Sequence, residues 1–192
     1  MPSLVLASGS PYRSELLSRL CLPFEAITPH LDESPLPNES PLATCERLAE
    51  AKARKIAETH PHALIVGSDQ IALLQGRLVG KPGNHANAVR QLQKASGQEV
   101  AFHTALCLLN AMTGQIQQDR VVSTVRYRIL SDNQIERYLK ADQPYDCAGS
   151  GRIETLGITL LEWVKSDDPT ALIGLPLIRL TTMLRHEGIE IP

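Results

Sequence analysis

Arg13 is the first residue whose type suggests chemistry. It comes three residues after Ser10, and if Ser10 caps a helix that Pro11 opens, a cation stands where a capping box places Glu or Gln. A cation at this end opposes the helix dipole unless an anion binds the free amides of the first turn. Two interpretations stay open: a solvated arginine on an ordinary capped helix, or an anion site formed by backbone amides, Ser10 and Arg13.

Lys52 is the second such residue, because it lies on the apolar stripe of a helix predicted over 41–59. The stripe steps by three and four residues through Leu42, Cys45, Ala49, Lys52 and Ile56. A lysine in this place can extend its ammonium out to solvent. Alternatively, the ammonium binds a phosphate or a carboxylate at the floor of a cleft.

Asp69 is the third, because it interrupts the apolar segment ALIVGSDQIALL. Burying a carboxylate without a cation or hydrogen bonds costs several kcal/mol in effective terms, so such a residue needs a partner. The alternative is a turn between two shorter strands, since Gly67, Ser68 and Asp69 are all turn formers.

Further charged groups extend this set. Glu33 follows Asp32 in a proline-rich loop, and Lys81 lies in the tight turn GKPG. Carboxylates suit a hard cation, and lysine and arginine suit phosphate oxygens. This combination is typical of a metal-assisted nucleotide hydrolase.

The chain does not match other common phosphate-binding and catalytic patterns. Four residues separate Cys147 from Arg152, one fewer than in the Cys-x5-Arg loop of thiol-dependent phosphatases. Neither GxGxxG nor GxxxxGK[ST] occurs in the chain. Any nucleotide phosphates are therefore expected to be bound by side chains and a metal.

The elements that must position these residues alternate along the chain. Strands are predicted over 4–7, 24–28, 63–74, 77–79, 100–111 and 115–129, with a last one ending near 164. Helices are predicted over 11–20, 41–59, 85–96, 131–140 and 176–188. In the strand over 115–129, Val121, Val125, Tyr127 and Ile129 share the buried face. The pattern favours an α/β fold with a mixed sheet and flanking helices, as a single domain over 1–192 with a cleft.

Composition limits the partners and the location. The net charge is −2 and aromatic residues make up 4%, so a long nucleic acid is not an expected partner. No apolar run reaches the ~18 residues that span a membrane, and the start of the chain lacks signal-peptide character, so we expect a cytoplasmic protein. The Cys and His residues are too scattered to frame a metal site or a disulfide scaffold.

The segments LASGSPYRSELL, RLAEAKA, VGSDQ, GKPG and TALIGLPL, together with Glu33, follow one another across nearly the whole chain. In this order they resemble the Maf family of nucleoside triphosphate pyrophosphatases. The resemblance implies an inosine triphosphatase-like fold, a mixed sheet with a deep cleft between two lobes, often as a homodimer. It also implies a divalent metal, Mg²⁺ or Mn²⁺, and cleavage of a nucleoside triphosphate to the monophosphate and pyrophosphate.

The resemblance also implies roles for single residues. Asp69 matches the catalytic aspartate, which would accept a proton from the attacking water or orient it, and would also bind the metal together with Glu33. The residues that match the phosphate-binding positions are Ser8, Ser10, Arg13, Lys52 and Lys81. These roles agree with the unusual positions found from the residues themselves.

Three positions bear on the substrate. Members that prefer thymidine or uridine triphosphate carry Arg, Thr and Gln where this chain has Tyr12, Gln70 and Glu154. The present residues resemble the subgroup that prefers 7-methyl-GTP, a modified nucleotide removed from the pool. A carboxylate at Glu154 would accept hydrogen bonds from guanine and favour the charge of the methylated ring, and Tyr12 could add a cation-π face. The alternatives are a pyrophosphatase preferring dTTP or UTP, a non-catalytic nucleotide sensor acting on cell division, and a thiol-dependent phosphatase using Cys147.

Overall fold

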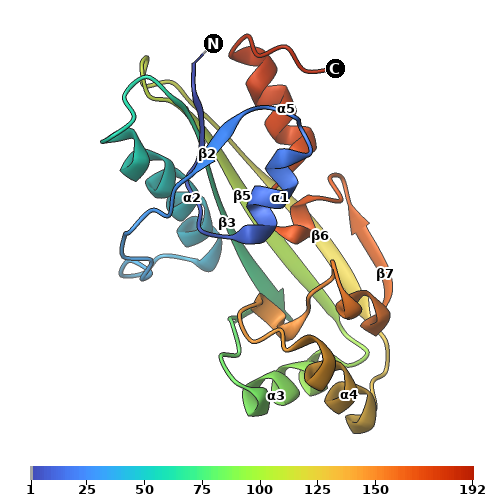
Figure 1. The fold of residues 1–192 in the computed structure, drawn as a ribbon. Coiled ribbons are helices and arrows are strands. Elements are labelled where there is room, and N and C mark those ends of the chain that lie inside the picture. The colour runs from blue at the N-terminus through green and yellow to red at the C-terminus, as the bar shows by residue number, and fades with distance from the viewer. Residues whose placement is uncertain (1) are drawn as a thin grey trace. The chain divides into compact units, whose positions relative to one another are not determined.

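The computed structural model describes residues 2–192, and strands and helices alternate along them (Figure 1). The strands are β1 (Leu4–Leu6), β2 (Phe24–Ala26), β3 (Leu64–Leu74), β4 (Arg77–Val79), β5 (Glu99–Asn110), β6 (Ile116–Tyr127) and β7 (Leu161–Ser166). The α-helices are α1 (Pro11–Ser18), α2 (Pro41–Ala57), α3 (His85–Ala95), α4 (Asp132–Asp142) and α5 (Leu177–His186). Short 3-10 turns are η1 (Ala148–Ser150), η2 (Leu156–Leu160) and η3 (Ala171–Ile173). Every strand and α-helix predicted from the sequence is present.

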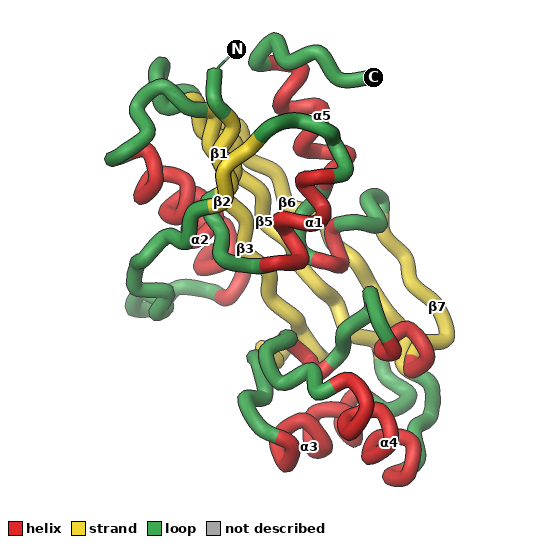
Figure 2. The backbone as a smooth tube through the Cα atoms, viewed as in Figure 1, coloured by secondary structure: helices red, strands yellow, loops and turns green. Residues whose placement is uncertain are grey.

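The strands form a mixed sheet, which confirms the predicted fold class. Their order is β2-β1-β3-β5-β6-β7, and Figure 2 labels these six strands. β4 pairs with β3 outside this row. β1 runs parallel to both β2 and β3, whereas β4 is antiparallel to β3 and β7 is antiparallel to β6. Among residues 2–192, none of the helices combines the length and the apolar composition that a membrane span requires.

The described chain divides into two compact units. The first contains residues 2–70, 104–121 and 168–192, and the second contains 71–103 and 122–167. β3, β5 and β6 each supply residues to both units.

In the first unit, the two faces of β3 pack against different helices. Successive side chains of a strand point to opposite faces. Leu64 and Val66 lie in the core cluster with leucines of α1 and α5, and Gly67, on the other face, lies against Ala49 of α2. Figure 1 shows α1 and α5 on one side of these strands and α2 on the other. The turn considered for Gly67 to Gln70 is wrong, because β3 runs unbroken through these residues.

Helix α2 begins as predicted. Ser40 accepts a hydrogen bond from the amide of Ala43 at 3.2 Å, and Pro41 occupies the first turn, where its missing N–H costs nothing. Four of the five residues of the predicted stripe are buried, and Lys52 is one of them, at 6% exposure. The helix therefore carries a lysine into the packed layer between itself and β3.

In the second unit, α3 and α4 contact each other, and η2 packs on α4. Ser131 and Gln134 form a capping box at the start of α4.

The prediction that Ile129 is buried is wrong: this residue is 84% exposed because β6 ends at Tyr127. Val121, Val125 and Tyr127, which lie within the strand, are buried as predicted.

Candidate active site

Lys52 of α2 joins the two carboxylates that the sequence singled out. Its Nζ lies 2.6 Å from Oδ1 of Asp69 on β3 and 3.0 Å from Oε1 of Glu33 in the loop between β2 and α2. The side chains of Lys52 and Asp69 are 8% and 13% exposed, so the ion pair is largely removed from water. Asp69 thus has the cationic partner that its position demands, and the interpretation of Lys52 as a lysine extended into solvent is wrong.

The two carboxylates are the groups of this cluster that could hold a divalent metal. Mg²⁺ is usually bound by one or two carboxylates, substrate phosphates and several waters. Oδ2 of Asp69 and Oε2 of Glu33 accept no hydrogen bond from any described residue, so each carboxylate keeps a ligand atom. Within residues 2–192 there is no group of three or more His, Cys, Asp or Glu side chains that could bind a metal ion.

Arg13 is held by main-chain oxygens. Its Nε donates to the carbonyl of Gly174 at 2.8 Å, and its Nη1 donates to the carbonyl of Ser68 at 2.8 Å. Nη1 also lies 3.5 Å from Oγ of Ser8, a residue that is buried. The interpretation of Arg13 as a solvated arginine is therefore wrong. Nη2 donates to none of the described residues.

The start of α1 places Arg13 beside the carboxylates. Ser10 is the helix cap, and its Oγ accepts a hydrogen bond from the Arg13 amide at 3.4 Å. Burial lowers the pKa of the Arg13 guanidinium from its ordinary value, and the charges of Asp69 and Glu33 counteract this shift. Arg13 thus acts electrostatically on the same two carboxylates that flank Lys52.

Gln70 lies on the opposite face of β3 from Asp69. Its Nε2 donates to Oγ1 of Thr104 at 2.8 Å and to the carbonyls of Ala171 and Leu172 at 2.9 and 3.1 Å. The amide group therefore anchors the segment 171–174, whose Gly174 carbonyl also binds Arg13. Tyr12, on α1, is half-buried.

Sequence reasoning missed Asp168, which fixes this segment. Its carboxylate is fully buried and accepts hydrogen bonds from Thr170 Oγ1 at 2.7 Å and from the amide of Ile178, at the start of α5, at 2.7 Å. A carboxylate at a helix N-terminus is favoured by the helix dipole. The sequence signal was weak, because Asp167, Asp168 and Pro169 look like an ordinary turn.

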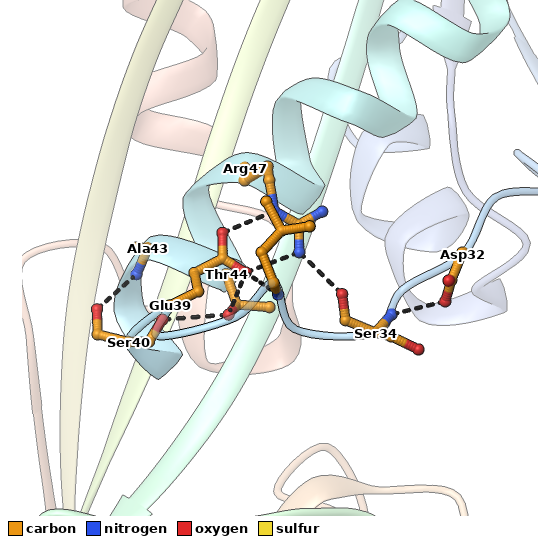
Figure 3. Close-up of polar contacts among 8 residues, drawn as sticks. Asp32, Ser34, Glu39, Ser40, Ala43, Thr44 and Arg47 are labelled. Carbon is orange, nitrogen blue, oxygen red and sulfur yellow. Dashed lines mark hydrogen bonds and ion pairs between the residues drawn. The ribbon is translucent and has the colours of Figure 1, made fainter.

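The loop that carries Glu33 is tied to α2 by side chains (Figure 3). Asp32 Oδ1 accepts a hydrogen bond from the amide of Ser34 at 2.9 Å, and the carbonyl of Ser34 accepts one from Nη2 of Arg47 at 3.1 Å. Arg47 lies on α2, upstream of Lys52. Both residues that flank Glu33 in sequence are thus fixed by hydrogen bonds.

Lys81 belongs to the second unit and is exposed. Its turn follows β4 and is fixed at both ends: the Gly80 carbonyl accepts from Gln91 Nε2 at 3.0 Å, and the Gly83 amide donates to the Tyr145 carbonyl at 3.0 Å. The lysine side chain therefore extends from a firmly held backbone.

Glu154 also lies in the second unit, exposed in the turn that precedes η2 and not at a strand edge. Asp142, at the end of α4, binds both sides of this turn. It accepts from Thr155 Oγ1 at 2.7 Å, and its Oδ1 lies 3.6 Å from Nη1 of Arg152. The turn that presents Glu154 is therefore fastened to α4.

Three of the four cysteines, Cys45, Cys107 and Cys147, do not have the character of nucleophiles. Burial raises the pKa of the Cys147 thiol to about 11 and those of Cys45 and Cys107 to about 12. A protonated thiol is a poor nucleophile. This disfavours a thiol-dependent phosphatase that uses Cys147.

Comparison with known proteins identifies the chain as a member of one family. The 7-methyl-GTP pyrophosphatase of Methylobacillus flagellatus is 56% identical to this chain, over 100% of both chains. That of Cupriavidus metallidurans is also 56% identical, over 97% of this chain and 94% of its own. That of Nitrosospira multiformis is 55% identical over 98% of this chain and 95% of its own. A solved structure of a HAM1 protein from Coxiella burnetii matches with a TM-score of 0.46 at 15% identity, covering 66% of this chain and 73% of the other. The family described as Maf-like protein matches residues 3–187, and the chain belongs to this family.

Proposed function

We propose that this protein hydrolyses a nucleoside triphosphate, 7-methyl-GTP, to the monophosphate and pyrophosphate. The observation that carries the proposal is the convergence of Asp69 and Glu33 on the Lys52 ammonium, beside Arg13. The names of relatives that are 54–56% identical to this chain support the substrate.

The chain's residues supply alignment and charge. Asp69 would orient the attacking water and accept its proton as the water oxygen bonds to the α-phosphorus. The bond from this phosphorus to the bridging oxygen breaks, and pyrophosphate leaves. Lys52, Lys81 and Nη2 of Arg13 would bind phosphate oxygens, with Ser8 and Ser10 at the start of α1.

A divalent metal, Mg²⁺ or Mn²⁺, would be held by Glu33 and Asp69 together with the phosphates. When bound, it would neutralise negative charge on the phosphate chain. Lys52 would then turn from the carboxylates towards the phosphate oxygens, a change that its flexible four-carbon stem permits. A homodimer and a cytoplasmic location are further parts of this proposal.

Base selection would depend on Glu154, with Tyr12 and Gln70. Glu154 lies on an exposed turn that Asp142 fixes, so its side chain extends from a defined backbone. A carboxylate can accept from two guanine donors and attracts the positive charge of a 7-methylated ring.

The test is a screen of canonical and methylated nucleoside triphosphates, with pyrophosphate and orthophosphate measured separately. We expect 7-methyl-GTP to give the highest kcat/KM and pyrophosphate to be the product. Asp69→Asn should lower turnover by about two to four orders of magnitude while leaving the circular dichroism spectrum unchanged. Orthophosphate as the first product would contradict the proposal, as would binding without turnover, which is the behaviour of a sensor.

A further inference from the structure

The loop between β2 and α2 carries Glu33 but has little apolar surface of its own to hold it. From Asp32 to Asn38 every residue is exposed, and the Glu33 side chain is 55% exposed. Ordering an exposed glutamate costs conformational entropy, because its side chain can adopt several rotamers. Its carboxylate can be held in one place only if the backbone that carries it is also held.

Arg47 supplies that constraint through Glu39. Nε and Nη2 of Arg47 donate to the two oxygens of Glu39 at 2.7 and 2.8 Å, a two-pronged pairing in which the Glu39 side chain is only 10% exposed (Figure 3). Glu39 also accepts from Thr44 Oγ1 at 2.8 Å and from the amide of Leu36 at 2.9 Å. A single carboxylate thus joins the loop to the first turns of α2.

The same guanidinium reaches the residue next to Glu33. Nη2 of Arg47 donates to the Ser34 carbonyl at 3.1 Å, as well as to Glu39. Glu33 then meets Lys52, which lies on the same helix as Arg47, at 3.0 Å. Helix α2 therefore positions both partners: it carries Lys52, and through Arg47 it holds the backbone next to Glu33.

We propose that Arg47 and Glu39 form a clasp that positions Glu33 for metal binding, with Arg47 acting as a positioning residue. The proposal rests on the proposed function, because it assigns Glu33 to the metal. Residues that orient a metal ligand without touching the metal typically change metal affinity or activity by about 10- to 100-fold when they are replaced. The alternative is that the pair only stabilises the start of α2.

The test compares Arg47→Met with Arg54→Met. Arg54 lies on the same helix and, among residues 2–192, pairs with Glu50 on that helix, so its variant removes an arginine without touching the loop. Arg47→Lys is the conservative variant, which keeps the charge but not the two-pronged pairing. Three quantities are measured: amide hydrogen exchange of the segment 32–39, the Kd of Mn²⁺ by electron paramagnetic resonance with α,β-methylene-GTP present, and the dependence of kcat on Mg²⁺ concentration.

For Arg47→Met we expect faster exchange in 32–39 and a Kd for Mn²⁺ raised about 10-fold. The Mg²⁺ concentration for half-maximal kcat should rise by a similar factor, with most of kcat recovered at saturating Mg²⁺. Arg47→Lys should lie between Arg47→Met and the wild type, and Arg54→Met should match the wild type. If Arg47→Met does not fold, the comparison of Arg47→Lys with the wild type decides.

A lower melting temperature with unchanged Mn²⁺ affinity would overturn the clasp, because it would assign a purely structural role to Arg47. So would a loss of kcat that is equal at all Mg²⁺ concentrations. Failure of the proposed function would look different: the wild type itself would release no pyrophosphate from any nucleoside triphosphate.

Discussion

Gly67 of β3 lies directly against the main-chain carbonyl of Ala49 in α2. A Cβ built on Gly67 would collide with this oxygen, and it would also lie 3.1 Å from the amide nitrogen of Ala53. Lys52 follows Ala49 by about one helical turn, and Asp69 follows Gly67 on the same face of the strand. The absence of a side chain at Gly67 therefore allows the approach that brings Lys52 to Asp69.

Gly67→Ala should push α2 away from β3, because neither of the two backbones can yield as a side chain could. Overpacking of this kind costs about 1–3 kcal/mol of unfolding free energy. Misplacement of the reacting groups by about 1 Å can cost about 100-fold in kcat/KM. Thermal unfolding and kinetics of the purified variant measure both effects. A variant with wild-type activity would show that α2 can shift without disturbing the ion pair.

Lys52→Met should abolish most activity and also destabilise the fold, since it leaves the Asp69 carboxylate in a largely buried place without its cation. Removing one partner of a buried pair costs about 3 kcal/mol or more. Adding Asp69→Asn to Lys52→Met should recover stability but not activity. Melting temperatures and kcat/KM of the two single variants and the double variant provide the comparison. If the double variant is less stable than Lys52→Met, the two side chains are not coupled as described.

Glu154→Gln should lower kcat/KM for 7-methyl-GTP more than for UTP, by roughly 5- to 150-fold, because it removes the charge that favours the methylated base. Adding Tyr12→Arg and Gln70→Thr should shift preference towards dTTP or UTP. A common factor for all substrates would mean that Glu154 does not select the base.

Gln70→Thr carries a cost of its own in that experiment. It removes the Nε2 donor that binds the carbonyls of Ala171 and Leu172. We therefore expect a lower melting temperature for every variant that contains this change, and Gln70→Thr alone is the control that separates stability from selectivity.

Acid should weaken the loop that carries Glu33. Hydrogen bonds from Arg47 and the amide of Leu36 lower the pKa of Glu39 to about 2, below its ordinary value. A carboxyl group whose pKa is lowered by folding stabilises the native state above its ordinary pKa, and this contribution is lost as the pH falls towards the folded-state pKa. The melting temperature of the wild type should thus fall more steeply between about pH 4.5 and pH 2 than that of Glu39→Gln. Parallel curves would contradict this.

Local signals in the sequence predicted the elements and part of the site. Ser40 and Pro41 gave the start of α2, and the apolar stripe placed Lys52 on its buried side. These predictions succeeded because capping and helical periodicity act over a few neighbouring residues. The continuity of β3 through Gly67 to Gln70 was ambiguous, because residue type alone does not distinguish a turn from a strand that contacts a helix backbone.

The contacts of Arg13 could not be predicted in the same way. Its partners are the carbonyls of Ser68 and Gly174, and every residue has a carbonyl. Only the folded chain brings a particular one within reach. The prediction that Ile129 is buried failed for a related reason. The residue at which a strand ends depends on its pairing with neighbouring strands, and the hydrophobic periodicity of the sequence carries no information about that pairing.

The segment from Ala171 to Gly174 has an implication for mutational scanning. It contacts Gln70 and Arg13 through main-chain oxygens, and these survive almost any substitution of its own side chains. Leu172→Ala, for example, keeps the carbonyl that Gln70 binds. A scan of single substitutions would therefore underestimate how strongly the site depends on this segment, whereas deletion of one residue would displace all three carbonyls at once.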